Sequence, residues 1–219
     1  MLTIAHRGFS KDYPENSILA FEKAIEVQVD GIEADVRLSK EGQILIAHDS
    51  YQVKSRSYIE KTSYKRLLFL PTLEMVLEHV NNRCILILEI KRHKASKDRL
   101  PFILAPLIED KLDWIEVSSF DDGILWRMQE LNSNIRLHKL IDRAKVLEQA
   151  NFDKKYSTMY AFDIHVGLKD HPKTLELLAG GQKVIFWVVD THAISSYPTL
   201  FGAMSDDPLI LKKQDTLLV

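Results

Sequence analysis

The chain has 219 residues, of which 46% are hydrophobic and 27% charged, with a formal net charge of −2. This balance gives no electrostatic case for a nucleic-acid-binding protein, and the length suits one barrel or doubly wound domain with a sizeable core. The longest apolar runs, such as 84–90, are far shorter than the roughly 20 residues that cross a bilayer, so we expect no membrane span. The short stretch before the first motif and the single cysteine, Cys84, favour a cytoplasmic protein.

Apolar strand-like runs alternate with amphipathic stretches along the whole chain, which is typical of a parallel sheet or barrel with outer helices. Strands are predicted at 2–6, 31–37, 44–48, 84–90, 114–118, 135–140, 159–164, 184–189 and 202–205. Helices are predicted at 17–27, 73–80, 101–111, 123–131, 144–150, 172–178 and 192–200.

Nine strands are one too many for an eight-stranded barrel, and the short connection 38–43 accounts for the surplus. It is too short for a βα crossover, so the second and third strands should form an antiparallel hairpin closed near Glu41 and Gly42. The other eight strands fit a single (β/α)₈ TIM barrel over residues 1–219, with a reduced hairpin and cap insertion at about 39–70 after the second barrel strand.

Three carboxylates lie near the ends of apolar strands, where barrel enzymes carry their sites. Glu33 and Asp35 are one residue apart, so their side chains leave a strand on the same face and can share one hard cation. Glu89 follows the apolar run 84–88, and Lys91 faces the same way two positions later. These three acids predict a site for one divalent cation, Mg²⁺ or Ca²⁺ with Mn²⁺ as an alternative. Salt-bridged acids at strand ends are the competing interpretation.

His6 and His48 are the predicted general acid and base, because imidazole titrates near neutral pH and one ring can accept a proton while the other donates one. Breaking a phosphodiester also needs positive charge against the transition state, which Arg7 and Lys91 could supply. Hydrogen-bonded structural histidines, and ion pairs of these cations with Glu15 or Glu89, are the alternatives. The remaining strand histidines, His138 and His165, are predicted to lie near the rim in structural roles.

An ordered series of motifs connects these residues: Ala5-His6-Arg7-Gly8, Pro14-Glu15-Asn16-Ser17, Ile32-Glu33-Ala34-Asp35-Val36, Ile46-Ala47-His48-Asp49 and Leu88-Glu89-Ile90-Lys91. The series resembles the glycerophosphodiester phosphodiesterase family, whose signature reads His-Arg-Gly, Pro-Glu-Asn-Thr, Glu-x-Asp-Val, His-Asp and Glu-Ile-Lys. The stretches 70–74, 118–121 and 186–190 are also similar to family motifs, and the closing Gly202 to Asp206 matches loosely. The resemblance covers residues 3–208.

The resemblance implies a metal-dependent phosphodiesterase that converts glycerophosphodiesters to glycerol 3-phosphate and an alcohol. A substrate hydroxyl attacks phosphorus, the alcohol leaves, and water then opens the cyclic phosphate, with His6 and His48 handling the protons. Trp187 is implied to pack against the alcohol, although plain core packing is the alternative. Glu15, Asn16 and Asp49 are predicted to support these residues. Glu15 would hold Arg7 in place, and Asn16 would cap the first helix.

The chain departs from the family after Asp49, where about 21 residues without glycine replace a longer, glycine-containing cap. A shorter cap predicts a more open site, so the small-molecule substrate could be a glycerophosphodiester or a bulkier lysophospholipid. The alternatives are therefore a lysophospholipase D, a sphingomyelinase-D-like lyase that stops at the cyclic phosphate, and a non-catalytic barrel that binds phosphate ligands. Neither the oligomeric state nor the alcohol follows from the sequence.

Overall fold

The computed structural model describes residues 1–219 except 94–98, 190–193, 195 and 216–219. Its longer strands are β1 (Leu2–Ala5), β2 (Gly31–Leu38), β3 (Ile44–Ile46), β6 (Ile85–Ile90), β7 (Ile115–Ser119), β8 (Leu137–Ile141), β9 (Ala161–His165), β10 (Val184–Trp187) and β11 (Gly202–Ser205). A separate ribbon comprises β4 (Tyr51–Gln52) and β5 (Ser57–Tyr58).

The α-helices are α1 (Ile18–Glu26), α2 (Leu73–Val80), α3 (Arg99–Ile108), α4 (Asp122–Leu131), α5 (Ala144–Leu147), α6 (Phe152–Lys155), α7 (Pro172–Ala179) and α8 (Pro208–Asp215). Short 3₁₀ turns occupy η1 (Ile59–Lys61), η2 (Tyr64–Arg66), η3 (Glu109–Lys111) and η4 (Val166–Leu168).

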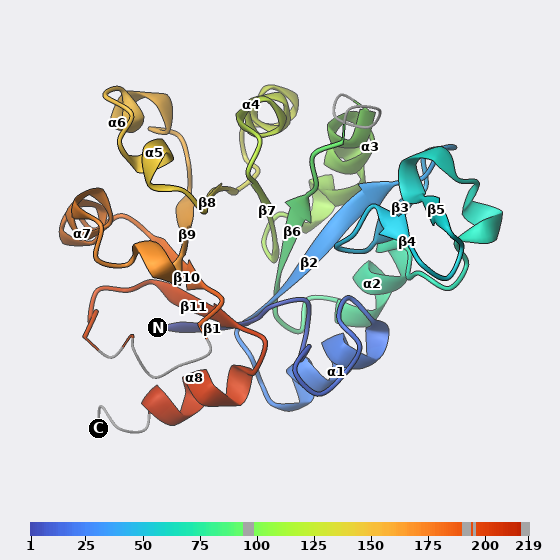
Figure 1. The fold of residues 1–219 in the computed structure, drawn as a ribbon, viewed down its shortest axis with the longest axis horizontal. Helices are drawn as coiled ribbons and strands as arrows, with labels where there is room; N and C mark the ends of the chain where they lie inside the picture. Colours follow the sequence, from blue (N-terminus) through green and yellow to red (C-terminus); the bar gives the residue numbers. More distant parts are fainter. Residues whose placement is uncertain (94–98, 190–193, 195, 216–219) are drawn as a thin grey trace.

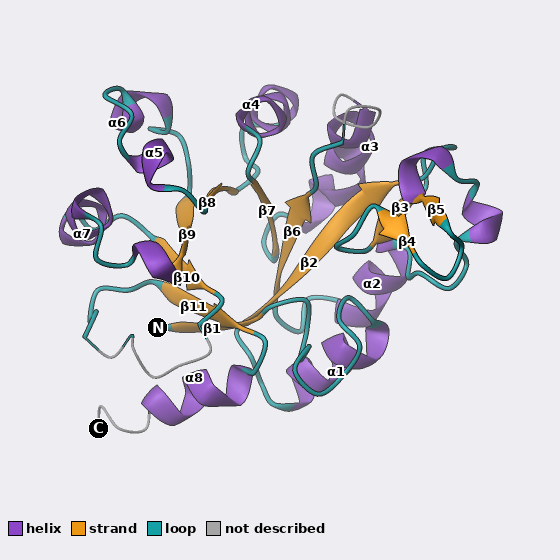
Figure 2. Ribbon diagram, viewed as in Figure 1, coloured by secondary structure: helices purple, strands orange, loops and turns teal. Residues whose placement is uncertain are grey.

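The strands close into a parallel barrel. Within the described residues, the nine-stranded sheet has the order β1-β11-β10-β9-β8-β7-β6-β2-β3, and an additional parallel pairing of β1 with β2 joins its ends into a ring. Helices surround the strands on the outside of this ring (Figure 1, Figure 2). The predicted (β/α)₈ barrel is confirmed, and β10, which ends at Trp187, is the seventh strand of the ring in chain order.

The strand β3 lies outside the ring, as the hairpin prediction required. It pairs antiparallel with β2, with Val36 opposite Ile46 and Leu38 opposite Ile44, and Gly42 takes a positive φ of 104° in the turn. Because β3 ends at Ile46, two residues earlier than predicted, His48 lies on a loop instead of a strand. The chain then forms the β4–β5 ribbon and two 3₁₀ turns before α2, and Leu45, Ala47, Ile59 and Leu67 form a small apolar core beneath this insertion.

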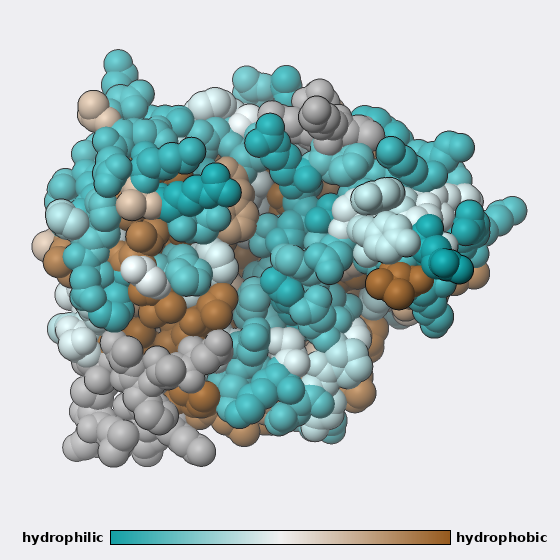
Figure 3. Space-filling model, viewed as in Figure 1, coloured by the Kyte–Doolittle hydropathy of each residue, from teal (hydrophilic) through white to brown (hydrophobic). Residues whose placement is uncertain are grey.

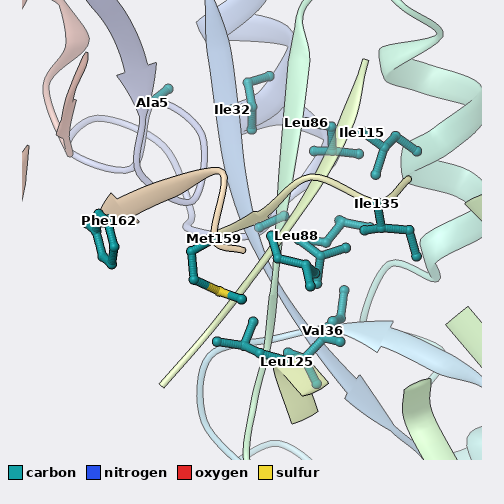
Figure 4. Packing of buried hydrophobic residues seen from close by; sticks show 14 of the residues in the cluster. Ala5, Ile32, Val36, Leu86, Leu88, Ile115, Leu125, Ile135, Met159 and Phe162 are labelled. Carbon is teal, nitrogen blue, oxygen red and sulfur yellow. The ribbon is translucent and has the colours of Figure 1, made fainter. Parts of the chain in front are cut away.

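Alternate side chains of β2 point to opposite sides of the barrel wall, some to the hydrophobic core outside it and some to the interior. On β2 the outward side chains Ile32, Ala34 and Val36 belong to the large core between strands and helices, part of which Figure 4 shows. The intervening Glu33 and Asp35 therefore face the barrel interior, since neighbouring strand residues point to opposite faces. All of β2 is buried, so its two inward acids must find charge or hydrogen-bond partners inside the barrel.

Two helical predictions need correction. The predicted helix 144–150 is shorter than expected, because α5 ends at Leu147, and α6 that follows it was not predicted. The helix α8 was also not predicted, although Asp207 accepts a hydrogen bond from Leu209 N and Pro208 opens the helix, a recognisable start signal. The predicted helix 192–200 lies partly outside the described residues.

Candidate active site

A cavity of about 210 Å³ opens at the carboxyl ends of the barrel strands and gathers most of the predicted site. Its lining includes His6, Arg7, Glu33, His48, Glu89, Lys91 and Trp187, together with Ser118 and Phe120. Asp35 lies beside this lining and is fully buried. The predicted supporting residues Glu15, Asn16 and Asp49 line an adjoining groove of about 400 Å³, and His48 belongs to both cavities.

The three predicted metal-binding acids form one buried cluster. Glu33, Asp35 and Glu89 each offer an oxygen within 4.8 Å of the other two. Asp35 and Glu89 lie opposite each other in the parallel register of β2 and β6, which explains how residues far apart in sequence meet. Among the described residues, Glu33 Oε1 is buried without a hydrogen-bond partner, while its other oxygen accepts a hydrogen bond from the backbone N–H of Arg7 at 3.1 Å.

Two cations partly neutralise this cluster. The ammonium of Lys91 lies 2.8 Å from Asp35 Oδ1 and 2.7 Å from Glu89 Oε1. Arg7 Nε lies 3.3 Å from Asp35 Oδ2, and its Nη1 donates to Glu15 at 2.8 Å. Both predicted phosphate-binding cations are therefore in the cavity, and both also make the ion pairs that the alternative interpretation expected.

The electrostatics distinguish the acids. Burial, followed by repulsion from Asp35 and Glu89, raises the pKa of Glu33 well above its usual value. Burial also acts to raise the pKa of Asp35, but Lys91, Arg7 and the Asn16 amide outweigh it and lower that pKa. Burial raises the pKa of Glu89 despite the nearby Lys91. Glu33 is therefore the acid that most lacks a compensating positive charge.

This arrangement fits a divalent cation. Three ionised carboxylates exceed the charges of Arg7 and Lys91 by one, and the unpartnered oxygen of Glu33 is the kind of buried acceptor that a cation satisfies. All of the donor atoms are carboxylate oxygens, which suits a hard ion such as Mg²⁺ or Ca²⁺. Glu33, Asp35 and Glu89 would hold it, with Glu33 giving up the proton that its raised pKa favours.

A left-handed turn between β1 and α1 positions Arg7. Arg7 has φ 57° and Gly8 has φ 80°, and a Cβ on Gly8 would lie 2.7 Å from the carbonyl carbon of Ala20 in α1. Only glycine permits this close approach without strain. The turn brings the backbone N–H of Arg7 onto Glu33 and leaves the guanidinium between Glu15 and Asp35.

The proposed cap of the first helix was wrong. Ser17, not Asn16, caps α1, because the Ser17 side chain accepts a hydrogen bond from Ala20 N. Asn16 takes φ 56° and turns inward, where its amide donates to Asp35 Oδ2 at 2.7 Å and accepts from the Asp35 backbone N–H at 3.1 Å. Asn16 thus fixes the orientation of the Asp35 carboxylate. Glu15 contacts Arg7 as predicted.

Each predicted catalytic histidine has a carboxylate at Nδ1. His6 Nδ1 lies 2.6 Å from Asp206 Oδ1, and His48 Nδ1 lies 3.0 Å from Asp49 Oδ1. His6 Nε2 is 4.0 Å from Glu33 Oε2. Burial and the cations Lys91 and Arg7 lower the pKa of His48, which favours its neutral form near neutral pH.

Several residues around these histidines were missed by the sequence analysis. Asp206, whose pKa is lowered by its hydrogen bond to His6, could have been found from the closing motif 202–206. Arg37 donates from Nε and Nη2 to the backbone carbonyl of His48, at 2.9 and 2.6 Å, and forms a buried ion pair with Glu60 at 2.9 Å. The local sequence does not predict the ion pair of Arg37 with Glu60, because that contact forms only when the insertion folds over β2.

Aromatic rings form one wall of the cavity. Trp187 packs edge-on against Phe120, with 5.8 Å between ring centroids, and against His165 at 4.8 Å. Its side chain lines the cavity, while the buried indole Nε1 has no hydrogen-bond partner among the described residues. His165 therefore lies beside the site, as its predicted rim position implied.

His138 does not lie near the rim. It is fully buried inside the barrel, with Nδ1 3.0 Å from Asp163 Oδ1 and Nε2 2.8 Å from Glu116 Oε2. Despite its burial, these two carboxylates raise the pKa of His138 to about 10. The next inward residue along β8, Leu140, lines the cavity, so the charged trio lies beneath the cavity floor.

Comparisons with known proteins identify the family of this chain. The model of the glycerophosphoryl diester phosphodiesterase family matches residues 6–204. A glycerophosphodiester phosphodiesterase of Bacillus altitudinis is 31% identical over 201 residues, which cover 80% of this chain and 79% of that protein.

Solved structures share the barrel fold. An Oleispira antarctica phosphodiesterase in complex with the product sn-glycerol-3-phosphate is similar with a TM-score of 0.86 at 21% identity, over 99% of this chain and 97% of that one. A glycerophosphodiester phosphodiesterase from Thermotoga maritima gives 0.84 at 24% identity, over 97% and 98% of the two chains. In the described part of this chain, no helix has the length and apolar character needed to cross a membrane.

Proposed function

The chain belongs to the glycerophosphoryl diester phosphodiesterase family, and from this premise we propose that it hydrolyses glycerophosphodiesters to glycerol 3-phosphate and an alcohol, using His6, His48 and a divalent cation. The observation that carries the proposal is the convergence of two imidazoles, two cations and three carboxylates on one cavity. The product named for the Oleispira antarctica phosphodiesterase, sn-glycerol-3-phosphate, supports the same product here.

The residues divide the chemistry among them. Arg7 and Lys91 bind the phosphate oxygens, Arg7 through its forked donors and Lys91 as a point charge. A divalent cation held by the three acids would neutralise phosphate charge and lower the pKa of the attacking hydroxyl. Trp187, with Phe120 beside it, offers an apolar wall to the alcohol part of the substrate.

The histidines transfer the protons. One imidazole accepts a proton from the substrate hydroxyl that attacks phosphorus, and the other donates a proton to the leaving alcohol; they exchange roles when water opens the cyclic phosphate. In each ring a carboxylate at Nδ1, Asp206 or Asp49, fixes the orientation and leaves Nε2 for the substrate. These contacts are the support for assigning both residues to catalysis.

The test is release of glycerol phosphate from glycerophosphocholine and glycerophosphoethanolamine by chelator-stripped protein, with Mg²⁺, Ca²⁺ or Mn²⁺ added back in turn. We expect turnover only with metal, and losses of at least about 100-fold in His6→Ala and His48→Ala. His79→Ala, on the outer helix α2, is the matched control and should retain wild-type turnover. Near wild-type turnover of His6→Ala would contradict the proposal, and metal binding without any turnover would favour a non-catalytic barrel.

The short insertion supports lysophospholipids as a second substrate class. The groove of about 400 Å³ adjoins the catalytic cavity at His48, which lines both, and it offers space for an alcohol larger than choline. Phosphorus NMR of the products distinguishes hydrolysis from a lyase reaction, because a lyase leaves the cyclic phosphate and a hydrolase gives the open monoester.

A further inference from the structure

The insertion that follows β3 exposes large apolar side chains. Val53 is 80% exposed, Leu68 66%, Tyr58 49% and Tyr51 47%. Tyr51 and Tyr58 are partners across the β4–β5 ribbon and their rings meet edge-on at 5.3 Å, so exposed apolar groups are adjacent here instead of scattered. Adjacent exposed apolar groups mark interaction surfaces more often than single ones do.

The same segment is strongly basic although the chain as a whole is slightly acidic. Residues 50–70 contain five cations and one acid, whereas the formal net charge of the chain is −2. The cations are Lys54, Arg56, Lys61, Lys65 and Arg66, and all five are exposed. The one acid, Glu60, is buried in its ion pair with Arg37. Of the neighbouring acids, Glu41 accepts a hydrogen bond from Tyr64 N, and Asp49 lies at the rim of the groove.

Contacts connect several of these basic and aromatic groups, and we name the segment that carries them the insertion tip (residues 51–69). The ammonium of Lys54 lies 4.8 Å from the centre of the Phe69 ring, and that of Lys61 lies 5.6 Å from the centre of the Tyr58 ring. Arg66 donates to the backbone carbonyl of Ser55, which ties η2 to the β4–β5 ribbon. Figure 3 shows apolar and hydrophilic surface side by side over the β4–β5 part of the molecule.

The tip also lies beside the groove that adjoins the catalytic cavity. Tyr51, Val53 and Lys54 line the groove that shares His48 with the cavity. Anything that binds the tip is therefore held next to the reacting groups. Protein interfaces are depleted in lysine, whereas lysine and arginine beside exposed aromatic and aliphatic groups suit an anionic membrane surface, where the charges meet headgroups and the apolar groups reach the acyl boundary.

We propose that the insertion tip docks on an anionic lipid surface and thereby presents the catalytic cavity to phosphodiesters carried in the membrane. The proposal deepens the function proposed above, because it identifies membrane-borne lysophospholipids as the substrate class that benefits from docking. Docking itself does not require turnover, so the two proposals can fail separately.

The test is co-sedimentation with vesicles of phosphatidylcholine alone and of phosphatidylcholine with about 30% phosphatidylserine, at low and high salt. We expect binding only to the phosphatidylserine vesicles, weakened by salt. Lys61→Glu with Lys65→Glu should reduce this binding at least about tenfold, and Leu68→Ser should reduce it at low and high salt alike. The matched control, Lys145→Glu with Lys154→Glu, makes the same charge change on α5 and α6, across the barrel from the tip (Figure 1).

Turnover separates docking from catalysis. The Lys61→Glu, Lys65→Glu variant should hydrolyse water-soluble glycerophosphocholine at the wild-type rate, but should lose activity on lysophosphatidylcholine embedded in anionic vesicles. Vesicle binding without any turnover would leave docking intact and overturn the proposed function. Absence of binding to phosphatidylserine vesicles, or equal loss in the control variant, would overturn docking. A dimer in sedimentation velocity that only the tip substitutions dissociate would instead identify a second copy of the chain as the occupant.

Discussion

His6 is oriented by an acid 200 positions away in sequence. Asp206 Oδ1 lies 2.6 Å from His6 Nδ1, and the Ser10 hydroxyl lies within hydrogen-bond distance of two acceptors, Asp206 Oδ1 at 3.0 Å and the backbone carbonyl of His6 at 2.8 Å. A carboxylate at Nδ1 fixes the tautomer and stabilises the imidazolium that forms during proton transfer. We therefore infer that Asp206 positions His6 for the proposed proton transfer.

The first prediction concerns this contact. Asp206→Asn should keep the fold but lower kcat at least about 100-fold with little change in KM, because the amide no longer stabilises a charged His6 ring. Asp207→Asn is the matched control: Asp207 is the adjacent acid, pairs with Lys11 and contacts Leu209 N, and does not bind His6. Steady-state kinetics on glycerophosphocholine measure both variants. A similar kcat in Asp206→Asn and the control would show that the contact is unimportant for turnover.

At the scale of elements, β7, β8 and β9 contribute a charged trio to the barrel interior. Glu116, His138 and Asp163 are each at most 3% exposed, and Arg136 Nε lies 3.2 Å from Glu116 Oε1. Removing one member of a buried ion pair leaves an uncompensated charge and costs about 3–5 kcal/mol. The trio is thus a place where one substitution should weaken three strands together.

The second prediction follows from the raised pKa of His138. The pKa of His138 is about 10 in the folded protein, against 6.5 for an unperturbed histidine. The charged ring therefore makes its full contribution to stability below pH 6.5, and this contribution is lost as the pH rises through about 10. His138→Leu should lower the free energy of unfolding by about 3 kcal/mol or more near pH 6, and the difference from wild type should shrink at alkaline pH. Urea unfolding across this pH range measures it, with His79→Leu on α2 as the surface control. A pH-independent difference would show that lost packing, not charge, is responsible.

At the scale of the whole molecule, closure of the ring joins β1 to both β2 and β11. This closure places the β1–α1 turn beside Glu33 of β2, and the pairing of β2 with β6 adds Glu89 to the same cavity. A cation bound there would contact residues from distant parts of the chain, so it would bind the folded protein and not the unfolded one. Such selective binding stabilises the fold by mass action.

The third prediction is a metal-dependent melting temperature. At a free metal concentration about 100 times Kd, the folded protein should gain about 2.7 kcal/mol, seen as a rise in Tm of chelator-stripped protein when Mg²⁺, Ca²⁺ or Mn²⁺ is added. Glu33→Gln should melt near the wild-type temperature in chelator, because the raised pKa of Glu33 favours its neutral form without metal, but should gain little from metal. Glu22→Gln on α1 is the surface control. An equal rise in Tm for Glu33→Gln and wild type would place the cation elsewhere.

Much of the fold and the site follows from local pattern. The alternation of apolar strands and amphipathic helices predicts the barrel, and the short connection 38–43 predicts that β3 lies outside it. The period of two residues along a strand places Glu33 with Asp35, and Glu89 with Lys91, on the inner face. These inferences succeed because each depends on residues that are near one another in the chain.

Only the tertiary structure decided which of these groups meet. The contact of Asp206 with His6 depends on the pairing of β11 with β1. The hydrogen bonds from Arg37 to the His48 carbonyl depend on how the insertion folds. The burial of His138 inside the barrel depends on its register opposite Ser118. Asn16 donates to Asp35 and does not cap α1. A buried carboxylate depends on protein donors, whereas the exposed end of a helix can also bond to water. The sequence by itself determined the barrel, the chemical groups and the strand faces that carry them; ring closure and burial determined the partners and electrostatics of each group.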